Sequence, residues 1–274
     1  MVSSDKINII VFSKDRACQL DLHLRSLAAN FKEFNQNEIN VVYDFSDLQY
    51  LEGYQKLMEQ TYSNVKFYND NQFGSLKNTL TELMRLENKF TMYLCDDIIF
   101  VNPFSLNDKE IQIVKTEKDV MSTSLRLWKG IDFCYATNSS SPTPNFIKDF
   151  CWDWRTAIGD WGYPMSCDGN IYLTKFLSSK NAAINYVYPN HFEAALASTA
   201  DRNVPLTACY LSEPKLINIP ANIVQNVYSN RHANIKTPAI LNQLWLRDKI
   251  LDLDFYLGKK FNSVHVELDL KFKE

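Results

Sequence analysis

Glycine is scarce in this sequence, with seven residues in a chain of 274. The chain contains neither a Gly-x-Gly-x-x-Gly fingerprint nor a Walker-type Gly-Lys-Ser/Thr loop. Both motifs use glycine to bring the backbone close to a phosphate group. Their absence argues against the standard dinucleotide-binding and P-loop classes of nucleotide-binding protein.

Clustered cysteines are also missing. The six cysteines are scattered along the chain, and no Cys-x-x-Cys pair occurs. A structural zinc site needs ligands at close, regular spacing, and a disulfide framework is typical of small secreted domains. We therefore expect buried free thiols.

The sequence has no apolar run of about 18 residues, so it predicts no transmembrane helix. The net charge is -3 and the sequence pI is about 5.9, which argues against a general nucleic-acid-binding protein. The N-terminal residues enter an apolar run at once, without the h-region of a secretory signal. We expect a cytoplasmic protein.

Apolar runs and amphipathic segments alternate in the first hundred residues. Runs rich in β-branched and aromatic residues, typical of buried strands, cover residues 7–12, 39–43, 65–68 and 90–94. Helical periodicity lies between them, and Ser46 and Ser75 are the expected N-caps of the second and third helices. This pattern predicts an α/β fold with a mostly parallel sheet and helices on its faces.

The pattern is less regular after residue 103. We expect a solvated helix within residues 107–119 and a strand over 120–128, followed by an irregular region at 130–169. Three further helices are predicted, and their expected start signals are Asp168, Asn190 with Glu193 in the capping-box position, and Thr237-Pro238. A single domain is expected over residues 1–274.

Two adjacent carboxylates, Asp96 and Asp97, directly follow the fourth apolar run. Ligands of open α/β sheets bind just outside the carboxyl ends of the strands. Mg²⁺ and Mn²⁺ prefer oxygen ligands, commonly one or two carboxylates together with substrate phosphates. The sequence therefore predicts a divalent-cation site at this edge of the sheet.

Three tryptophans, Trp152, Trp154 and Trp161, are interleaved with acidic residues in the irregular region. Aromatic faces stack on sugar rings while carboxylates bind hydroxyl groups, so the segment could form the wall of a carbohydrate site. A second small hydrophobic core under a long loop would explain the same residues. The sequence leaves both interpretations open.

Taken in order, these features resemble a GT-A-type glycosyltransferase of the broad family-2-like group. The polar turn Ser13-Lys-Asp-Arg16 after the first strand and Leu24-Arg-Ser-Leu27 in the next helix resemble the opening of these enzymes. Leu94-Cys-Asp-Asp97 is similar to their Asp-x-Asp metal motif, with Cys95 in the place of the first Asp. The resemblance covers residues 7–130 well and the acid- and Trp-rich region more loosely.

The resemblance implies a GT-A fold with a nucleotide-sugar-binding half (1–130), an acceptor-side half (131–236) and a helical C-terminal extension (237–274). It implies Mn²⁺- or Mg²⁺-dependent transfer of a sugar from a nucleoside-diphosphate donor, with a UDP-sugar favoured. The expected acceptor is a glycan or lipid-linked glycan of surface polysaccharide assembly. Membrane contact would then be at most peripheral, at the inner face. The alternative is a non-catalytic carbohydrate-binding or scaffold protein that retains the fold.

The resemblance also assigns roles to individual residues. Asp97 and His232 are the expected metal ligands. The expected contacts to the nucleotide sugar are Ser13, Asp15, Arg16, Asp44, Asp96 and Arg126. Arg126 is an unusual charge within the strand expected over 120–128, and pairing with a carboxylate would also explain it. The acceptor hydroxyl must lose a proton to a general base, and the candidates are Asp168, then Asp160, with Glu193 third. His265 lies in no motif of this kind.

Overall fold

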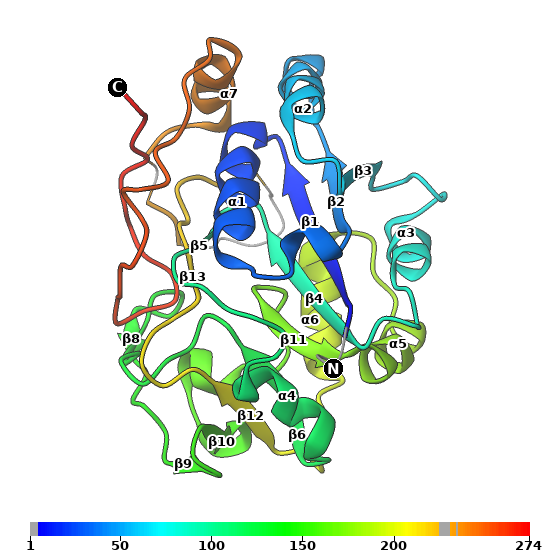
Figure 1. The fold of residues 1–274 in the computed structure, drawn as a ribbon, viewed down its shortest axis with the longest axis vertical. Helices are drawn as coiled ribbons and strands as arrows, with labels where there is room; N and C mark the ends of the chain where they lie inside the picture. Colours follow the sequence, from blue (N-terminus) through cyan, green and yellow to red (C-terminus); the bar gives the residue numbers. More distant parts are fainter. Residues whose placement is uncertain (1–4, 225–230, 234) are drawn as a thin grey trace.

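The computed structural model describes residues 5–224, 231–233 and 235–274. A nine-stranded sheet forms its centre, in the order β3-β2-β1-β4-β11-β6-β12-β10-β9 (Figure 1). Neighbouring strands from β3 to β4 run parallel, as do β6 and β12. The other neighbours run antiparallel, and β11 lies between β4 and β6. The predicted α/β fold with a mostly parallel central sheet is confirmed.

The strands are β1 (Ile7–Lys14), β2 (Ile39–Asp44), β3 (Val65–Asn69), β4 (Phe90–Cys95), β5 (Ile98–Phe100), β6 (Val120–Ser124), β7 (Phe133–Cys134), β8 (Ser139–Ser140), β9 (Phe146–Ile147), β10 (Cys151–Asp153), β11 (Asn170–Leu173), β12 (Leu206–Cys209) and β13 (Leu216–Asn218). The helices are α1 (Ala17–Asn30), α2 (Leu48–Gln60), α3 (Leu76–Leu83), α4 (Lys109–Thr116), α5 (Thr174–Ala183), α6 (Pro189–Ser198) and α7 (Pro238–Leu246), with short 3-10 turns η1 (Phe34–Gln36), η2 (Trp154–Thr156) and η3 (Gly159–Gly162).

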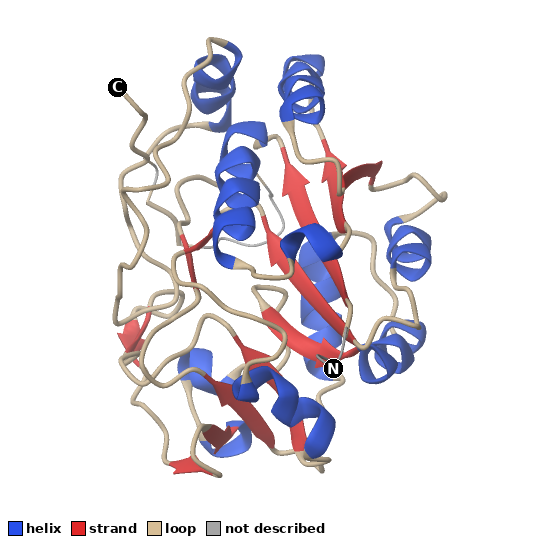
Figure 2. Cartoon of the chain, viewed as in Figure 1, coloured by secondary structure: helices blue, strands red, loops and turns tan. Residues whose placement is uncertain are grey.

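Alternate residues of β1 face two separate cores, as the two-residue period of a strand requires. Ile9 and Val11 pack with α1, α2, α4 and α7 on one face, whereas Ile10 and Phe12 pack with α3, α5 and α6 on the other. Figure 2 shows helices both in front of the sheet and behind it. Because helices cover both faces of the sheet, an open binding site is expected at the carboxyl ends of its parallel strands.

The second half departs from the predicted elements. The segment expected to be a helix from Asp168 instead forms β11, and the helix α5 begins only at Thr174. β6 ends at Ser124 rather than at residue 128, so Arg126 lies beyond the strand. After α7 the described chain contains no further helix, so the predicted helical tail is limited to α7. β6 and β11 pair with strands that are distant in the sequence, and local hydrophobic periodicity cannot predict such pairing.

The caps are partly as predicted. Ser75 caps α3 and Thr237 caps α7. Asp47 rather than Ser46 caps α2. The helix α6 begins at Pro189 with Tyr188 in the N-cap position, so Asn190 is its second residue and not its cap. All six cysteines are free thiols, as expected. Among the described residues, no helix combines the length and apolar character that crossing a bilayer requires.

Candidate active site

A cavity of about 750 Å³ lies at the edge where β1, β2 and β4 end. Side chains from both halves of the sequence line it. Of the predicted site residues, the cavity lining includes Ser13, Arg16, Asp44, Asp96, Asp97, Arg126, Asp160, Asp168, Glu193 and His232. The carboxyl ends of the parallel strands thus gather the predicted residues in one place, in agreement with the rule for open α/β sheets.

Asp15 is the exception, because it does not line the cavity. Its backbone has a φ of 55°, and its carboxylate accepts hydrogen bonds from Ser46 N (2.7 Å) and Ser46 Oγ (2.8 Å). The expected role of Asp15 as a nucleotide contact therefore has no geometric support. Asp15 instead ties the turn after β1 to the segment that follows β2.

Asp96 is fully engaged by the protein. Its Oδ1 accepts a hydrogen bond from Arg16 Nη1 (2.9 Å), and its Oδ2 accepts from Ser13 Oγ (2.8 Å) and Lys14 N (3.2 Å). The side chain is buried, and burial raises the pKa of its carboxyl although Arg16 opposes this. Asp96 therefore holds the turn after β1 against the end of β4.

Asp97 is the more accessible member of the acid pair. Its Oδ2 lies 3.3 Å from Arg16 Nη1, and its Oδ1 accepts a hydrogen bond from Asn218 Nδ2 (2.9 Å). Burial, reinforced by the neighbouring charges of Asp96 and Asp168, raises the pKa of Asp97 to about 7. One guanidinium therefore does not balance the negative charge at this point of the cavity.

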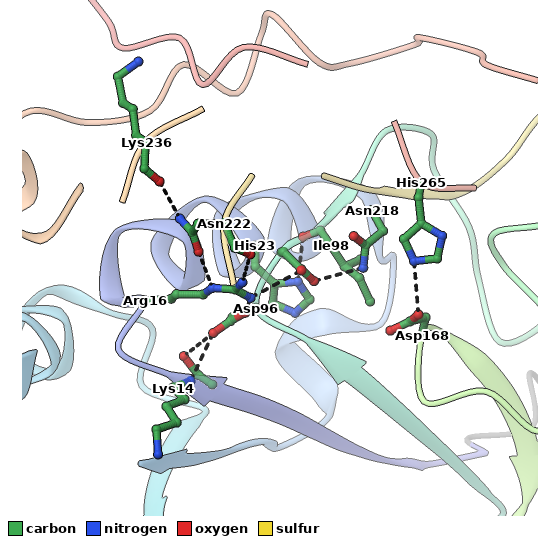
Figure 3. Close-up of polar contacts among 12 residues, drawn as sticks. Lys14, Arg16, His23, Asp96, Ile98, Asp168, Asn218, Asn222, Lys236 and His265 are labelled. Atoms are coloured by element: carbon green, nitrogen blue, oxygen red, sulfur yellow. Dashed lines mark hydrogen bonds and ion pairs between the residues drawn. The ribbon is translucent and has the colours of Figure 1, made fainter. Parts of the chain in front are cut away.

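Arg16 forms the centre of this network. Besides the two carboxylates, it donates from Nε to Asn222 Oδ1 (2.8 Å) and from Nη2 to Asn222 O (2.5 Å). Asn222 in turn donates to Lys236 O (2.9 Å), as Figure 3 shows. Arg16 is buried, and its position links the acid pair to the segment after β13.

A second charged cluster surrounds Arg126. Arg126 Nη1 lies 3.5 Å from Asp168 Oδ2 and 3.8 Å from Asp160 Oδ1. His265 Nε2 lies 3.8 Å from the same Asp168 oxygen (Figure 3). Burial lowers the pKa of His265, so this imidazole is neutral at neutral pH. Of the two explanations for Arg126 that the sequence offered, pairing with carboxylates is the one found.

Asp168 owes its position to the glycine that follows it. Gly169 has a φ of 79°, a left-handed conformation that favours glycine. A Cβ at this position would lie 2.3 Å from Leu216 Cδ2, and Gly169 N donates to Tyr93 O (2.9 Å). Asp168 therefore does not begin a helix, contrary to the prediction.

Glu193 does not take part in a capping box. Its Oε1 accepts hydrogen bonds from Cys167 N (2.9 Å) and Ser166 Oγ (3.2 Å), in the loop before Asp168. Burial, followed by the charge of Asp168, raises the pKa of Glu193 to about 7. The residue is therefore available to the cavity as a third carboxyl group of this cluster.

The raised pKa of Glu193 predicts a pH-dependent effect of Glu193→Gln. Stability linked to this group is fully present below about pH 4.5 and is lost as the pH rises through 7, because the folded state resists ionisation. Gln keeps an acceptor oxygen without the charge, so the variant should be more stable than the parent by about 1–3 kcal/mol at pH 8 and equal to it at pH 4.5. Chemical denaturation at both pH values measures this, and a difference that does not change with pH would contradict it.

The tryptophans belong to the protein core. Trp152 and Trp161 are fully buried and pack edge to face at 4.8 Å between ring centroids, and Trp154 is 8% exposed. The interpretation of these residues as carbohydrate-site walls is therefore wrong, and the small-core interpretation is correct. The indole of Trp152 donates to Trp161 O (2.9 Å), which satisfies its polar atom inside the core.

Several lining residues could not be found from the sequence. They are Asn218, Asn222, Tyr135, Tyr163, Tyr188 and His265. His265 reaches the cavity because its segment bridges to Asn218 at the end of β13. This pairing joins residues 47 positions apart in sequence, and no local pattern marks it. Tyr163 and Tyr188 lie beside short elements, and the sequence alone does not distinguish them from other aromatic residues that are buried.

No protein-family model matches this chain. A curated relative is the bifunctional glycosyltransferase pgtA of Dictyostelium discoideum, which is 27% identical over 300 aligned residues. The match covers 95% of this chain and 38% of the relative, so the chain spans less than half of the length of that protein.

Solved structures with partial likeness include S. aureus TarS 1-349 in complex with UDP-GlcNAc, at a TM-score of 0.47 and 16% identity, covering 92% of this chain and 69% of that chain. Another is the 4-diphosphocytidyl-2C-methyl-D-erythritol synthase from Anaerococcus prevotii, at a TM-score of 0.42 and 12% identity, covering 89% and 96%. Likeness at this level identifies neither a ligand nor a reaction.

The resemblance inferred from the turn after β1 and the acid pair after β4 thus has independent support from a relative aligned along nearly the whole chain. The sheet has the α/β architecture that this resemblance implies. The chain is therefore a sequence relative of a curated glycosyltransferase along 95% of its own length.

Proposed function

We propose that this chain transfers a sugar from a nucleoside-diphosphate donor, with a UDP-sugar favoured, to a hydroxyl group of a glycan or glycolipid. The observation that carries the proposal is one cavity that contains both the strand-end acid pair Asp96-Asp97 and the carboxylate cluster around Arg126. The first group is suited to the donor diphosphate and the second to deprotonation of an acceptor. Surface polysaccharide assembly is the proposed setting, with residues 1–130 serving the donor and 131–236 the acceptor.

The charges of the cavity support a requirement for a cation. The lysine and arginine side chains among its described lining residues are Lys14, Arg16, Arg126 and Arg231, and each has a carboxylate partner. Seven carboxyl groups line the same space. A diphosphate would add further negative charge, which four paired side chains do not offset. An added divalent cation would supply the missing positive charge.

The residues fit such a cation in one way. Within residues 5–224, 231–233 and 235–274, no group of three or more His, Cys, Asp or Glu side chains is placed to hold a metal ion. Mg²⁺, however, commonly uses one or two carboxylates together with substrate phosphates. Asp97 suits this role better than Asp96, because it accepts two hydrogen bonds, one of them long at 3.3 Å, and is the more exposed of the two side chains. Asp96 is more deeply buried and accepts three hydrogen bonds. We propose His232, which lines the cavity, as a second ligand.

A bound cation would act as a Lewis acid that neutralises charge on the departing nucleoside diphosphate. The chain itself would position the acceptor and remove its proton. We assign the general base to Asp168, which Arg126 and His265 contact on one oxygen, so that the other oxygen can face the acceptor hydroxyl.

The donor-binding part of the proposal predicts that Mn²⁺ strengthens UDP binding about tenfold or more. The cation and the negatively charged diphosphate would attract each other in one site, so each would favour binding of the other. Asp97→Asn should remove this enhancement. Asp70→Asn is the matched control, since it removes the same charge from the same cavity outside the acid pair. Isothermal titration calorimetry with and without Mn²⁺ measures both. No binding of UDP in either condition would refute the transferase proposal, and metal-independent binding that Asp97→Asn leaves unchanged would refute the cation role.

A further inference from the structure

Two exposed tyrosines stand at the cavity near the Arg126 cluster. Tyr163 is 36% exposed and Tyr188 is 53% exposed, and both line the cavity. Aromatic side chains that line a pocket provide apolar contact area for a bound ligand. These tyrosines occupy the place that the sequence assigned to the tryptophans, which are buried instead.

Each tyrosine directly adjoins an element that carries a carboxylate of the cavity. Tyr163 follows η3, which contains Asp160, and Tyr188 precedes α6, which contains Glu193. Burial, and next the charge of Glu193, raises the pKa of the Tyr163 hydroxyl, which places this ring within electrostatic reach of Glu193. The two aromatic rings and the two carboxylates are thus held by the same short segments.

Two residues of the Arg126 cluster also carry buried polar atoms that have no hydrogen-bond partner among the described residues. Asp160 is 7% exposed, and its Oδ2 is buried without a hydrogen-bond partner among the described residues. Arg126, 4% exposed, likewise has a buried Nε without a partner in that part of the chain. A buried polar atom without a partner is costly, so such atoms commonly mark the place of a ligand or a water molecule. Sugar hydroxyl groups can serve both as donors to Asp160 and as acceptors from Arg126.

The balance of charge selects among sugars. Asp160, Asp168 and Glu193 face a single cation, Arg126, in this cluster. A phosphate or carboxylate on the incoming sugar would be repelled by the excess of carboxylates. A neutral sugar would instead donate hydrogen bonds to them while its CH face stacks on an aromatic ring.

We infer that Tyr163 and Tyr188, together with Asp160 and Glu193, form an acceptor subsite that takes a neutral sugar and excludes one bearing phosphate or carboxylate. This inference rests on the proposed transferase function and specifies its acceptor class.

Saturation-transfer difference NMR tests the inference in the presence of UDP and Mn²⁺, which fill the donor side. The probes are methyl glycosides of glucose, galactose, mannose, fucose and N-acetylglucosamine, together with glucose 6-phosphate and methyl glucuronide. We expect at least one neutral glycoside to bind and neither anionic probe to do so.

Variants of the two tyrosines test the surface itself. Tyr188→Ala should weaken binding of the neutral probe about tenfold or more through loss of stacking, whereas Tyr188→Phe should retain it. Tyr163→Phe and Tyr163→Ala repeat the comparison. Tyr62→Ala is the control, since Tyr62 is 38% exposed but does not line the cavity.

Binding of the anionic probes, failure of every neutral probe, or unchanged affinity in both alanine variants would overturn the inference. UDP titration of the same samples distinguishes failure of the proposed function from failure of the acceptor inference. If UDP does not bind, the proposed function fails; if UDP binds normally and the glycoside results differ from expectation, only the acceptor inference fails.

Discussion

Asp168→Asn is expected to lower kcat for sugar transfer by about 10²–10⁴-fold, the usual contribution of a general base. The carboxylate is needed to take the acceptor proton, and an amide of the same shape does not accept it. Donor binding should be nearly unchanged, because the donor is assigned to the acid pair at the end of β4. Product formation from a UDP-sugar and a glycan acceptor measures kcat, and calorimetry with UDP measures donor binding.

The placement of Asp168 explains why it is preferred to Asp160. The charge of Asp168 raises the pKa values of both Asp97 and Glu193, so it lies within electrostatic reach of the donor side and the acceptor side. Asp160 is not among the main causes of either shift. A general base must reach the incoming hydroxyl close to the sugar donor, and for this reason we propose Asp168 rather than Asp160.

Asp160→Asn is the matched control for this prediction, because it removes the same charge from the same partner, Arg126. It should reduce turnover much less than Asp168→Asn and should mainly affect acceptor binding. The reverse order of effects would make Asp160 the base. Full activity in both variants would exclude both aspartates as the base and leave Glu193 as the remaining carboxylate candidate of this cluster.

Local sequence patterns were sufficient for the first half of the fold. Apolar runs of β-branched and aromatic residues predicted β1, β2, β3 and β4. β1, β2 and β4 are largely buried on both faces and need no polar alternation, whereas β3, at the end of the sheet, is only partly buried. The amphipathic stripe of α1 and the Ser75 cap of α3 also depend on neighbouring residues alone. The position of Asp96 and Asp97 followed directly from the strand that they end.

The second half could not be predicted in the same way, because its elements depend on distant partners. β11 has only four residues and is a strand because it fits between β4 and β6. Asp168, which precedes it, was therefore assigned to a helix start that does not exist. The contact between Asp168 and His265 joins the centre of the chain to its C-terminal segment, which no spacing rule indicates.

The type of a residue alone also did not show whether its side chain belongs to the core or to the cavity, because its burial decides this. Trp161 and Tyr163 lie two positions apart in the same acid-rich turn, yet the first is fully buried and the second is 36% exposed at the cavity. Arg16 was expected to contact the nucleotide, whereas its guanidinium is occupied by Asp96, Asp97 and Asn222. Arg16 therefore serves as a counterion for the acid pair rather than as the predicted contact to the nucleotide sugar.

Arg16→Met is therefore expected to cause the largest loss of stability, about 3–5 kcal/mol in the free energy of unfolding, the usual result of removing one partner of a buried ion pair. Asp96 would keep its bonds to Ser13 and Lys14 but lose its only countercharge among the described residues. The loss should grow as the pH rises from 6 to 8. Without the guanidinium the folded-state pKa values of Asp96 and Asp97 rise further above their unfolded values, and stability linked to a raised carboxyl pKa is lost with increasing pH.

Urea denaturation at pH 6 and pH 8 measures this effect, and two variants define its cause. Arg85→Met removes a guanidinium from an exposed pair with Glu38 and should cost only about 0–1 kcal/mol. Combining Arg16→Met with Asp96→Asn should recover part of the lost stability, because the buried charge that Arg16 neutralises is removed with it. A loss below about 1 kcal/mol, or a double variant less stable than Arg16→Met alone, would show that the acid pair does not depend on Arg16 and that the cavity meets its negative charge by other means.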